Sequence, residues 1–378
     1  MDCSAILKKK EIKISVPCRI DLGGTLDIST FFLPLNYLGP STFNIALDMR
    51  TEIQLSAFKP GFVRVCSRGF KSAEFKAGQA VFDHPLGLMF AVAAYFNATG
   101  VQIKINSASP PRSALGGSSA AAVAITAAFL KIQQTKAHGV GQENNRDHNP
   151  YQDKDKNSCD NKDIDPEKSA LIAHYIESSV AGVPCGLQDQ LAAAFGGVNT
   201  WHWSLGASGP EFIQEKIFKN HDGMEEFNKN ILVAYCGIPH VSKDINKRWV
   251  HQFLSAENRD KWEEVCTITA AFSQAVKLRQ YSAAGALMNR ETRLRLSMTP
   301  DVLDQTGKDL FESAEKSGCG SRFTGAGAGG CVWAIGPSDN IEKLKKVWKT
   351  LLEEKNHAAL LDTKIDPVGI LEVKKEIK

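Results

Sequence analysis

The fold of this chain is decided by the stretch Pro110-Pro111-Arg112-Ser113-Ala114-Leu115-Gly116-Gly117-Ser118-Ser119. Before it, Val101-Gln102-Ile103-Lys104-Ile105 alternates between apolar and polar side chains, which is typical of a strand. After it, small and apolar residues run from Ala120 to Leu130 without a helix breaker. They predict a buried helix. The order is therefore strand, Gly/Ser loop and helix start.

This order creates an anion site at the start of the predicted helix. The first backbone N–H groups of a helix are free, and the helix dipole is positive at that end. Gly116 and Gly117 let the backbone approach a bulky anion, and Ser118 and Ser119 add hydroxyl groups that can bind phosphate or a metal. An ordinary helix cap is the alternative interpretation, because serine is common at that position.

Length and composition limit the class of protein. The chain has 378 residues, more than one typical core accommodates, so we expect two domains. A hydrophobic content of 43% and a charged content of 23% are ordinary for a globular protein. The net charge of +3 is too small to indicate a nucleic-acid or membrane-surface partner.

The cysteines and the N-terminal residues indicate a compartment. The nine cysteines are scattered without a Cys-x-x-Cys pair, which favours reduced thiols over disulfides or a zinc site. No apolar signal core follows Met1, and no run of residues is long enough to span a bilayer. We therefore expect a cytoplasmic protein with no membrane partner.

Two further turns carry polar residues. A predicted strand at 11–16 leads into Pro17–Asp27, a Gly-Gly turn that contains Arg19, Asp21 and Asp27. Arg and Asp in such a turn more often form a structural ion pair than a site, so this turn alone is weak evidence. The second turn, 182–187, precedes a short helical run that carries Asp189 in its opening residues. A favourable interaction with the helix dipole would explain that carboxylate by itself.

The remaining segments give the outline of the fold. Residues 134–168 contain almost no aliphatic side chains and predict a long polar surface loop. His138 and His148 within it lack partners at metal-ligand spacing. Helical patterns follow at 258–278, 283–296, 300–316 and 340–354, with strands predicted at 42–47, 51–58, 63–66, 231–234, 331–335 and 368–373.

Gly325–Gly330 fits the pattern G-x-G-x-x-G, but its surroundings exclude a dinucleotide site. Such a site needs a strand before the glycines and a helix after them, whereas here a strand follows. The His-Arg-Asp and Asp-Phe-Gly motifs of protein kinases and the Gly-Lys-Ser/Thr of a Walker A loop are also absent. The segment is interpreted as a turn that lets backbone pack closely against a ligand or another loop.

Together, these segments resemble the three ordered motifs of the GHMP kinase superfamily, named for galactokinase, homoserine kinase, mevalonate kinase and phosphomevalonate kinase. Pro17–Asp27 resembles motif one, Pro111–Ala120 the phosphate loop of motif two, and Thr324–Gly330 motif three. The run Gly182–Gln190 is similar to the segment that holds the catalytic aspartate of galactokinases. The Arg-Ile-Asp-Leu opening and the Gln-Asp-Gln run resemble the heptose-7-phosphate kinase and fucokinase branch.

The resemblance implies an α+β fold of two domains. Residues 1–200 would form an ATP-binding domain like ribosomal protein S5 domain 2, and residues 201–378 a ferredoxin-like domain. It also implies an ATP-dependent kinase that uses Mg²⁺ and transfers the γ-phosphoryl group to a hydroxyl of a small sugar or sugar phosphate. Heptose 7-phosphate, fucose and galactose are the candidate acceptors, and the anomeric hydroxyl is the expected position.

The resemblance assigns roles to individual residues. Asp189 would be the proton acceptor or would orient the acceptor hydroxyl, and Arg19 would stand beside it. Ser119 and Glu177 would bind Mg²⁺. The sugar would contact Asp27, Asp21 and Gly24. The nucleotide phosphates would be held or supported by Pro111, Ser113, Ala114, Leu115, Gly116, Gly117, Ser118, Ser119, Gly325 and Gly327.

The chain departs from the family pattern at three points. Ala114 replaces the usual first glycine of motif two, Gly117 replaces a common serine, and motif one is one residue shorter than in sugar kinases. Two rival functions remain. One is a catalytically silent sugar and ATP sensor, against which Asp189, Glu177 and Arg19 argue. The other is a mevalonate-type enzyme, against which the Gln-Asp-Gln run argues.

Overall fold

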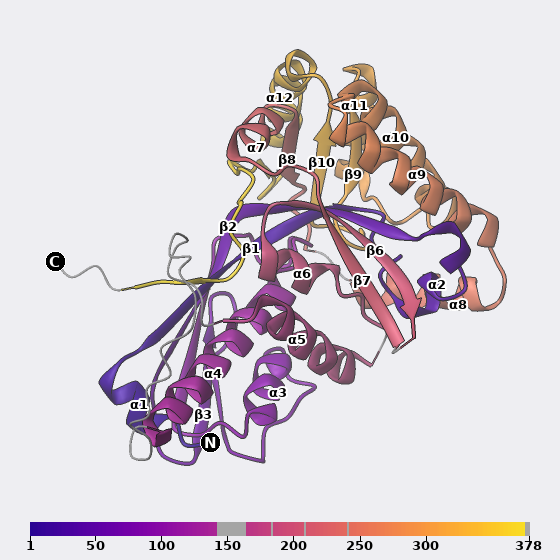
Figure 1. The fold of residues 1–378 in the computed structure, drawn as a ribbon. Helices are drawn as coiled ribbons and strands as arrows, with labels where there is room; N and C mark the ends of the chain where they lie inside the picture. Colours follow the sequence, from indigo (N-terminus) through magenta and orange to yellow (C-terminus); the bar gives the residue numbers. More distant parts are fainter. Residues whose placement is uncertain (142–163, 183, 208, 240–241, 375–378) are drawn as a thin grey trace, which may run out of the picture.

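The structure is a computed structural model and describes residues 1–141, 164–182, 184–207, 209–239 and 242–374. Two sheets, each with helices packed on it, make up the molecule (Figure 1). The predicted α+β class is therefore confirmed. Across the described ranges, no helix is long and apolar enough to cross a membrane.

The first sheet has eight strands over the described residues, in the order β12-β1-β2-β5-β3-β4, with β6 paired to β2 and β7 paired to β6. The strands are β1 (Ile12–Leu22), β2 (Ser41–Ala57), β3 (Phe62–Ser67), β4 (Ala73–Lys76), β5 (Val101–Ser107), β6 (Val198–Gly206), β7 (Gly209–Lys216) and β12 (Leu371–Glu372). β2 is one long strand where the sequence predicts two. Its first half pairs with β6 and its second half with β5, which explains why it stays extended throughout.

We call each sheet, together with the helices packed on it, a unit. The helices of the first unit pack together over one face of the first sheet (Figure 1). They are α3 (Gly87–Tyr95), α4 (Gly117–Gly141), α5 (Pro166–Ala181) and α6 (Gln188–Phe195), and a short α1 (Ser4–Lys9) lies beside β2. Residues 120–128 of α4 are fully buried. Their small side chains let α3, α5 and α6 all approach α4 closely.

The second sheet is antiparallel, in the order β11-β8-β10-β9. Its strands are β8 (Ile231–Tyr235), β9 (Gly320–Phe323), β10 (Cys331–Ile335) and β11 (Ala359–Leu360). The second unit's long helices are α8 (Ser242–Leu254), α9 (Arg259–Lys277), α10 (Tyr281–Met298), α11 (Gln305–Lys316) and α12 (Ser338–Glu353). Shorter helical turns are α2 (Ser29–Phe32), η1 (Asn36–Leu38) and α7 (His221–Asn228).

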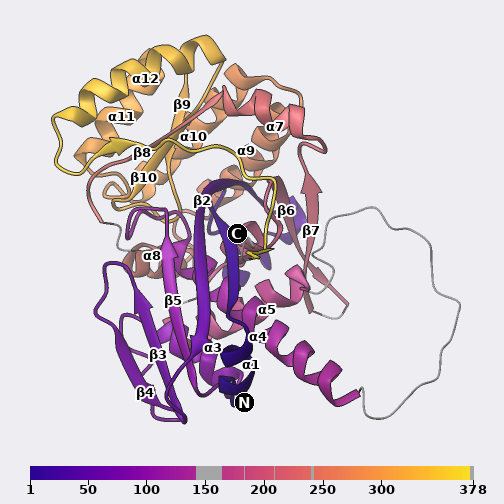
Figure 2. The same cartoon turned by 90° about the vertical axis from the view of Figure 1, so that its left-hand side faces the viewer.

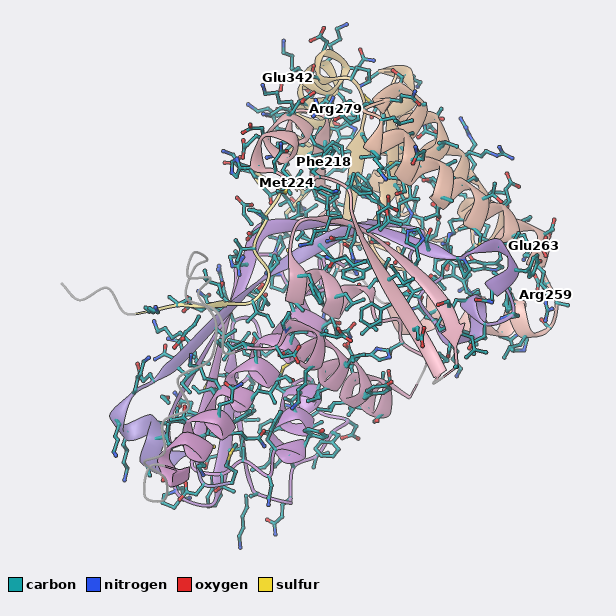
Figure 3. The ribbon with its side chains drawn as sticks, viewed as in Figure 1. Phe218, Met224, Arg259, Glu263, Arg279 and Glu342 are labelled. Atoms are coloured by element: carbon teal, nitrogen blue, oxygen red, sulfur yellow. The ribbon has the colours of Figure 1, made fainter. Side chains whose placement is uncertain are left out.

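One apolar cluster contains residues of both units. Phe43 of β2 meets Phe272 of α9 edge-on with ring centroids 5.1 Å apart, and Phe272 also contacts Trp333 of β10. Charged side chains such as Arg259, Glu263 and Glu342 stand on the outside of the second unit (Figure 3). Apolar burial along β1 and β2 therefore holds the units together.

The C-terminal segment returns from the second unit to the first (Figure 2). Arg50 of β2 pairs with Asp366 and donates to the carbonyl oxygens of Val368 and Gly369. The chain then pairs with β1 as β12, where the strand predicted at 368–373 covers only Leu371–Glu372. This segment ties the two units together covalently and by hydrogen bonds.

Two boundaries predicted from the sequence fall inside helices or strands of the structure. Part of the predicted polar loop 134–168 is helical, because 134–141 continues α4 and 166–168 opens α5. Residues 142–163, with His148, lie outside the described residues. The predicted division at 200/201 falls inside β6, which pairs with β2 of the first sheet. We propose that the first domain extends to the end of β7 instead.

Candidate active site

A cavity of about 810 Å³ lies where β1, α4, α5 and α6 meet the glycine loop of the second unit. We use the term phosphate loop for residues 110–119 and glycine loop for residues 324–330. The phosphate loop lines one wall of the cavity, and the first residues of α6 line another. Residues from all three sequence motifs therefore line one cavity.

The phosphate loop reaches the start of α4 through left-handed backbone positions. Gly116 has φ +74° and Ala114 has φ +61°. α4 then begins at Gly117, and Ala120 donates the first α-helical hydrogen bond of this turn to the carbonyl of Gly116. The N–H groups of the first turn are therefore available to an anion. Ala114 tolerates its conformation only at a strain cost, because a Cβ disfavours positive φ.

Arg19 and Asp189 form a two-point ion pair on the cavity wall. Arg19 Nε donates to Asp189 Oδ1 at 2.7 Å, and Nη2 donates to Oδ2 at 2.8 Å. The remaining nitrogen, Nη1, donates to the carbonyl of Ala114 at 2.6 Å. Arg19 is buried, whereas the Asp189 side chain keeps 24% of its surface exposed to the cavity. The guanidinium thus joins the phosphate loop to α6.

The charge state of Arg19 follows from its neighbours. Burial lowers the pKa of Arg19, but the carboxylates of Asp189 and Asp21 raise it above its usual value. The guanidinium stays charged. Since a carboxylate has about four lone-pair positions, Asp189 can still accept a hydrogen bond from a ligand after binding Arg19 twice.

Asp27 lines the cavity beside the first turn of α6. Its carboxylate accepts the backbone N–H groups of Thr25 and Gln188, each at 3.0 Å. Burial raises the pKa of Asp27 to about 6. Gly186 packs directly on this carboxylate, since an added Cβ would lie 1.7 Å from Asp27 Oδ2. The predicted sugar ligand is therefore a fixed carboxylate next to Asp189.

Glu177 of α5 faces the start of α4. Its Oε2 accepts hydrogen bonds from Ser119 Oγ at 2.8 Å and from Gln190 Nε2 at 2.7 Å. Burial raises the pKa of Glu177 to about 7. No group of three or more His, Cys, Asp or Glu residues able to hold a metal occurs in the described ranges. Two hard oxygen ligands, from Ser119 and Glu177, nevertheless suit Mg²⁺, which completes its shell with phosphate oxygens and water.

Three residues that the sequence assigns to ligand binding lie away from the cavity lining. Asp21 has no exposed surface, and its carboxylate accepts the N–H of Gly325 at 2.7 Å. A Cβ at Gly24 would collide with Asp21, and one at Gly327 would lie 2.4 Å from the carbonyl of Val302. Asp21, Gly24 and Gly327 therefore lie behind the residues that line the cavity, whereas Gly325 itself lines it.

The sequence does not single out the buried side chains of the second unit behind the glycine loop. Arg322 of β9 and Glu291 and Arg295 of α10 have no exposed surface. The spacing of Glu291 and Arg295 indicates a solvent-facing pair on a helix, so only the tertiary structure reveals them. Gln190 is also missed, although its place one residue after Asp189 is a signal that could have found it.

Comparison with known proteins gives a family match for the segment that carries the phosphate loop. Residues 84–140, which contain the phosphate loop and nearly all of α4, match the sequence model of the GHMP kinases N terminal domain. This part of the chain is therefore a GHMP kinase N-terminal domain. With the kinase relatives described next, the domain match identifies an ATP-dependent phosphotransferase, and the two-sheet α+β architecture is shared with solved kinase structures.

Individual GHMP kinases match over most of their length. Mevalonate kinases of Thermococcus sibiricus and Pyrococcus furiosus are each 23% identical to this chain, covering 80% of it and 85% of their own length. Among solved structures, the galactokinase of Lactococcus lactis complexed with galactose superposes with a TM-score of 0.67 at 15% identity, covering 98% of this chain and 99% of its own. The D-glycero-D-manno-heptose 1-phosphate kinase of Bacteroides thetaiotaomicron has a TM-score of 0.67 at 14% identity, covering 96% and 99%.

Proposed function

We propose that this GHMP kinase transfers the γ-phosphoryl group of ATP to a hydroxyl of a small sugar or sugar phosphate, at the anomeric position. One observation carries the proposal. A Cβ added at Gly116 would lie 3.3 Å from Oδ2 of Asp189, so that carboxylate lies directly against the phosphate loop. An acceptor hydroxyl bound to Asp189 is then next to an anion bound at the start of α4.

The nucleotide side of the cavity has the chemistry that ATP requires. Phe70, Met89 and Ile105 line it with apolar surface suited to a base. The phosphates would follow the loop to the N–H groups of α4, as at other helix N-termini that bind phosphate. These features support ATP as the phosphoryl donor.

Asp189 and Arg19 would carry the chemical step. Phosphoryl transfer depends mainly on positioning and on charge stabilisation. Asp189 would orient the acceptor hydroxyl and take its proton as the new P–O bond forms and the bond to ADP breaks. Arg19 would hold Asp189 in place and stabilise charge on the transferring group through its link to Ala114.

Ser119 and Glu177 would hold Mg²⁺ by their oxygen atoms. The bound ion would supply charge neutralisation to the nucleotide phosphates. Gln190 would keep Glu177 pointed at Ser119, because its amide donates to Oε2 of that carboxylate.

Asp27 supports a sugar acceptor. A carboxylate fixed by two backbone N–H groups is a good acceptor for sugar hydroxyls. Mevalonate, by contrast, carries a carboxylate of its own. Of the described residues that line the cavity, the arginines are Arg19, already paired with Asp189, Arg68, two residues before Phe70, and Arg112 of the phosphate loop. The match to mevalonate kinases makes mevalonate the second candidate acceptor.

A panel of acceptors tests the proposal. The purified protein with saturating Mg-ATP is offered galactose, fucose, heptose 7-phosphate and mevalonate, and ADP release is followed by a coupled assay. We expect turnover on at least one sugar and none on mevalonate. Turnover on mevalonate alone would refute the sugar assignment. A protein that binds a sugar tightly but phosphorylates no acceptor would support the sensor instead.

A further inference from the structure

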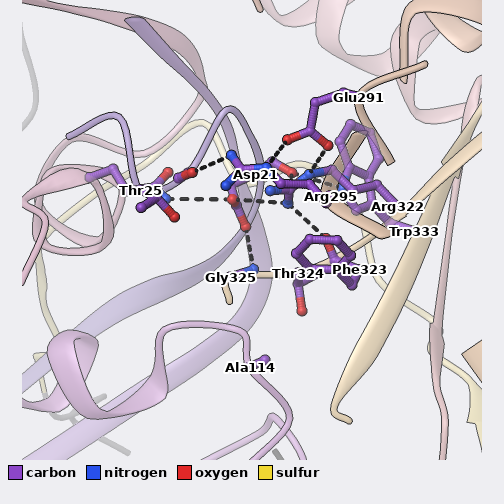
Figure 4. Close-up of polar contacts among 12 residues, drawn as sticks. Asp21, Thr25, Ala114, Glu291, Arg295, Arg322, Phe323, Thr324, Gly325 and Trp333 are labelled. Carbon is purple, nitrogen blue, oxygen red and sulfur yellow. Dashed lines mark hydrogen bonds and ion pairs between the residues drawn. The ribbon is translucent and has the colours of Figure 1, made fainter. Parts of the chain in front are cut away.

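A cluster of buried charges lies behind the glycine loop, where the second unit meets β1 (Figure 4). Arg322 Nε donates to Glu291 Oε2 at 2.8 Å, and Arg295 Nε donates to Glu291 Oε1 at 2.7 Å. Arg322 Nη1 also contacts the Asp21 carboxylate at 3.2 Å. We call Asp21, Glu291, Arg295 and Arg322 the arginine cluster. None of these four side chains has an exposed surface.

Aromatic rings and backbone carbonyls complete the cluster. The Arg295 guanidinium lies 4.3 Å from the ring centroid of Trp262 and 4.8 Å from that of Trp249. Its Nη2 donates to the carbonyl of Gly24 at 2.8 Å. The backbone carbonyl of Asp21 accepts from Trp333 Nε1 at 3.0 Å. The cluster therefore crosses from the second unit into the turn after β1.

Stability alone is a poor reason for such a cluster. Removing charges from water carries a large desolvation cost, and buried ion pairs can often be replaced by apolar side chains without loss of stability. Charged groups in a fixed geometry do supply orientation, because they fix the positions of the groups that they contact. The arginine cluster can therefore orient the groups that its side chains contact.

The contacts of Asp21 lead directly to the cavity. Its Oδ1 accepts the N–H of Gly325 and lies 3.8 Å from Arg19 Nη1, and its Oδ2 is 3.5 Å from Gln188 Nε2. Gln188 immediately precedes Asp189. Asp21 therefore touches the glycine loop, the arginine of the ion pair and the first residue of α6.

The glycine loop in turn packs on the phosphate loop. A Cβ added at Gly325 would lie 3.5 Å from the carbonyl oxygen of Ala114, and one added at Gly330 would lie 2.7 Å from that of Ser113. Such close packing of two backbones leaves little room for the phosphate loop to move. Arg322 thus contacts Asp21, Asp21 contacts Gly325 and Arg19, and Arg19 donates to the carbonyl of Ala114 in the phosphate loop.

We propose that Asp21 and Arg322 are positioning residues that fix the glycine loop against the phosphate loop, so that the second unit sets the affinity of the ATP site. The inference rests on the proposed function in taking the phosphate loop as the site of the ATP phosphates. It replaces the sugar-ligand role that the sequence suggests for Asp21.

Binding of Mg-ATP to single and double variants tests this role. Asp21→Asn keeps the shape and an oxygen that can accept the Gly325 N–H, but it removes the charge that faces Arg322 and Arg19. Arg322→Met keeps the length of the side chain and removes the guanidinium. Because a misplacement of about 1 Å caused by a distant substitution can cost about a hundredfold at an active site, we expect each to weaken Mg-ATP binding about tenfold or more by calorimetry. The double variant should lose no more Mg-ATP affinity than the single variant that binds Mg-ATP more weakly.

Arg50→Met is the matched control. Like Arg322, Arg50 is largely buried and pairs with a carboxylate, here Asp366. Arg50 itself lies outside the cavity lining. We expect Mg-ATP affinity within about twofold of the wild type, although its unfolding temperature should fall as in Arg322→Met. All affinities are measured well below the unfolding temperature of each variant.

Several results would overturn the inference. One is Mg-ATP binding by Asp21→Asn or Arg322→Met as tight as by Arg50→Met. Another is a double variant whose loss is the product of the two single losses, since independent residues behave in that way. If Arg322→Met does not fold, Arg322→Lys takes its place, with a smaller loss expected because the charge remains without the planar fork. A wild-type protein that binds no Mg-ATP would overturn the proposed function as well.

Discussion

Gly116 offers a prediction whose size follows from the geometry of the loop. Its φ of +74° belongs to the left-handed region, so replacement by alanine costs about 1–2 kcal/mol of stability. The new methyl group would also lie 3.3 Å from Asp189 Oδ2 and 3.5 Å from Arg19 Cγ. It would stand between the ion pair and the place where the phosphates bind. We expect Gly116→Ala to weaken Mg-ATP binding at least tenfold, equivalent to about 1.4 kcal/mol.

The chain provides a control with the same backbone strain. Gly61 has φ +76°, and an added Cβ there would meet no atom within 4 Å. Gly61→Ala should lose about as much stability as Gly116→Ala in denaturant unfolding, yet bind Mg-ATP as the wild type does. Calorimetry on both variants separates the effect of backbone strain from a direct effect on the Mg-ATP site. Equal Mg-ATP affinities for the two variants would refute the assignment of the loop.

Two further predictions concern the acceptor side. Because burial raises the pKa of Asp27 to about 6, its carboxylate becomes protonated as the pH falls through that value. The kcat/KM for the acceptor should then drop by up to about tenfold per pH unit below pH 6, and Asp27→Asn should have low kcat/KM without this acid limb. Gly186→Ala would push its methyl group into Asp27 Oδ2, so the acceptor KM should rise about tenfold while calorimetry shows unchanged Mg-ATP binding. A flat wild-type pH profile, or a Gly186→Ala enzyme with an ordinary acceptor KM, would contradict the role given to Asp27.

The sequence predicts those parts of the site that depend on local chemistry. Gly and Ser residues at a helix start can be recognised without the fold, and so the loop around Gly116 is found. The ordered motifs of a known family add the pairing of Arg19 with Asp189 and of Ser119 with Glu177. The structure brings each pair within hydrogen-bond distance.

The sequence does not predict burial that depends on contacts between residues far apart in the chain. Asp21 is hidden because Arg322 and Gly325, some 300 residues later, close over it. Glu291 and Arg295 have a spacing that is ordinary for an exposed helix face, and only the second sheet places that face in the core. The strand pair β6–β7 is missed for a similar reason, because β2 stabilises β6 through long-range pairing.

The most direct test of the account is the kinetics of Asp189→Asn. The substitution keeps the shape of the side chain but removes the charge that binds Arg19 and accepts the hydroxyl proton. General-base catalysis contributes about a hundredfold to ten-thousandfold, so kcat on the best sugar of the panel should fall within that range. Mg-ATP affinity should change little, because the phosphates are held by the start of α4. A variant with near wild-type kcat, or one that loses Mg-ATP binding and keeps its turnover rate, would contradict the central role of Asp189.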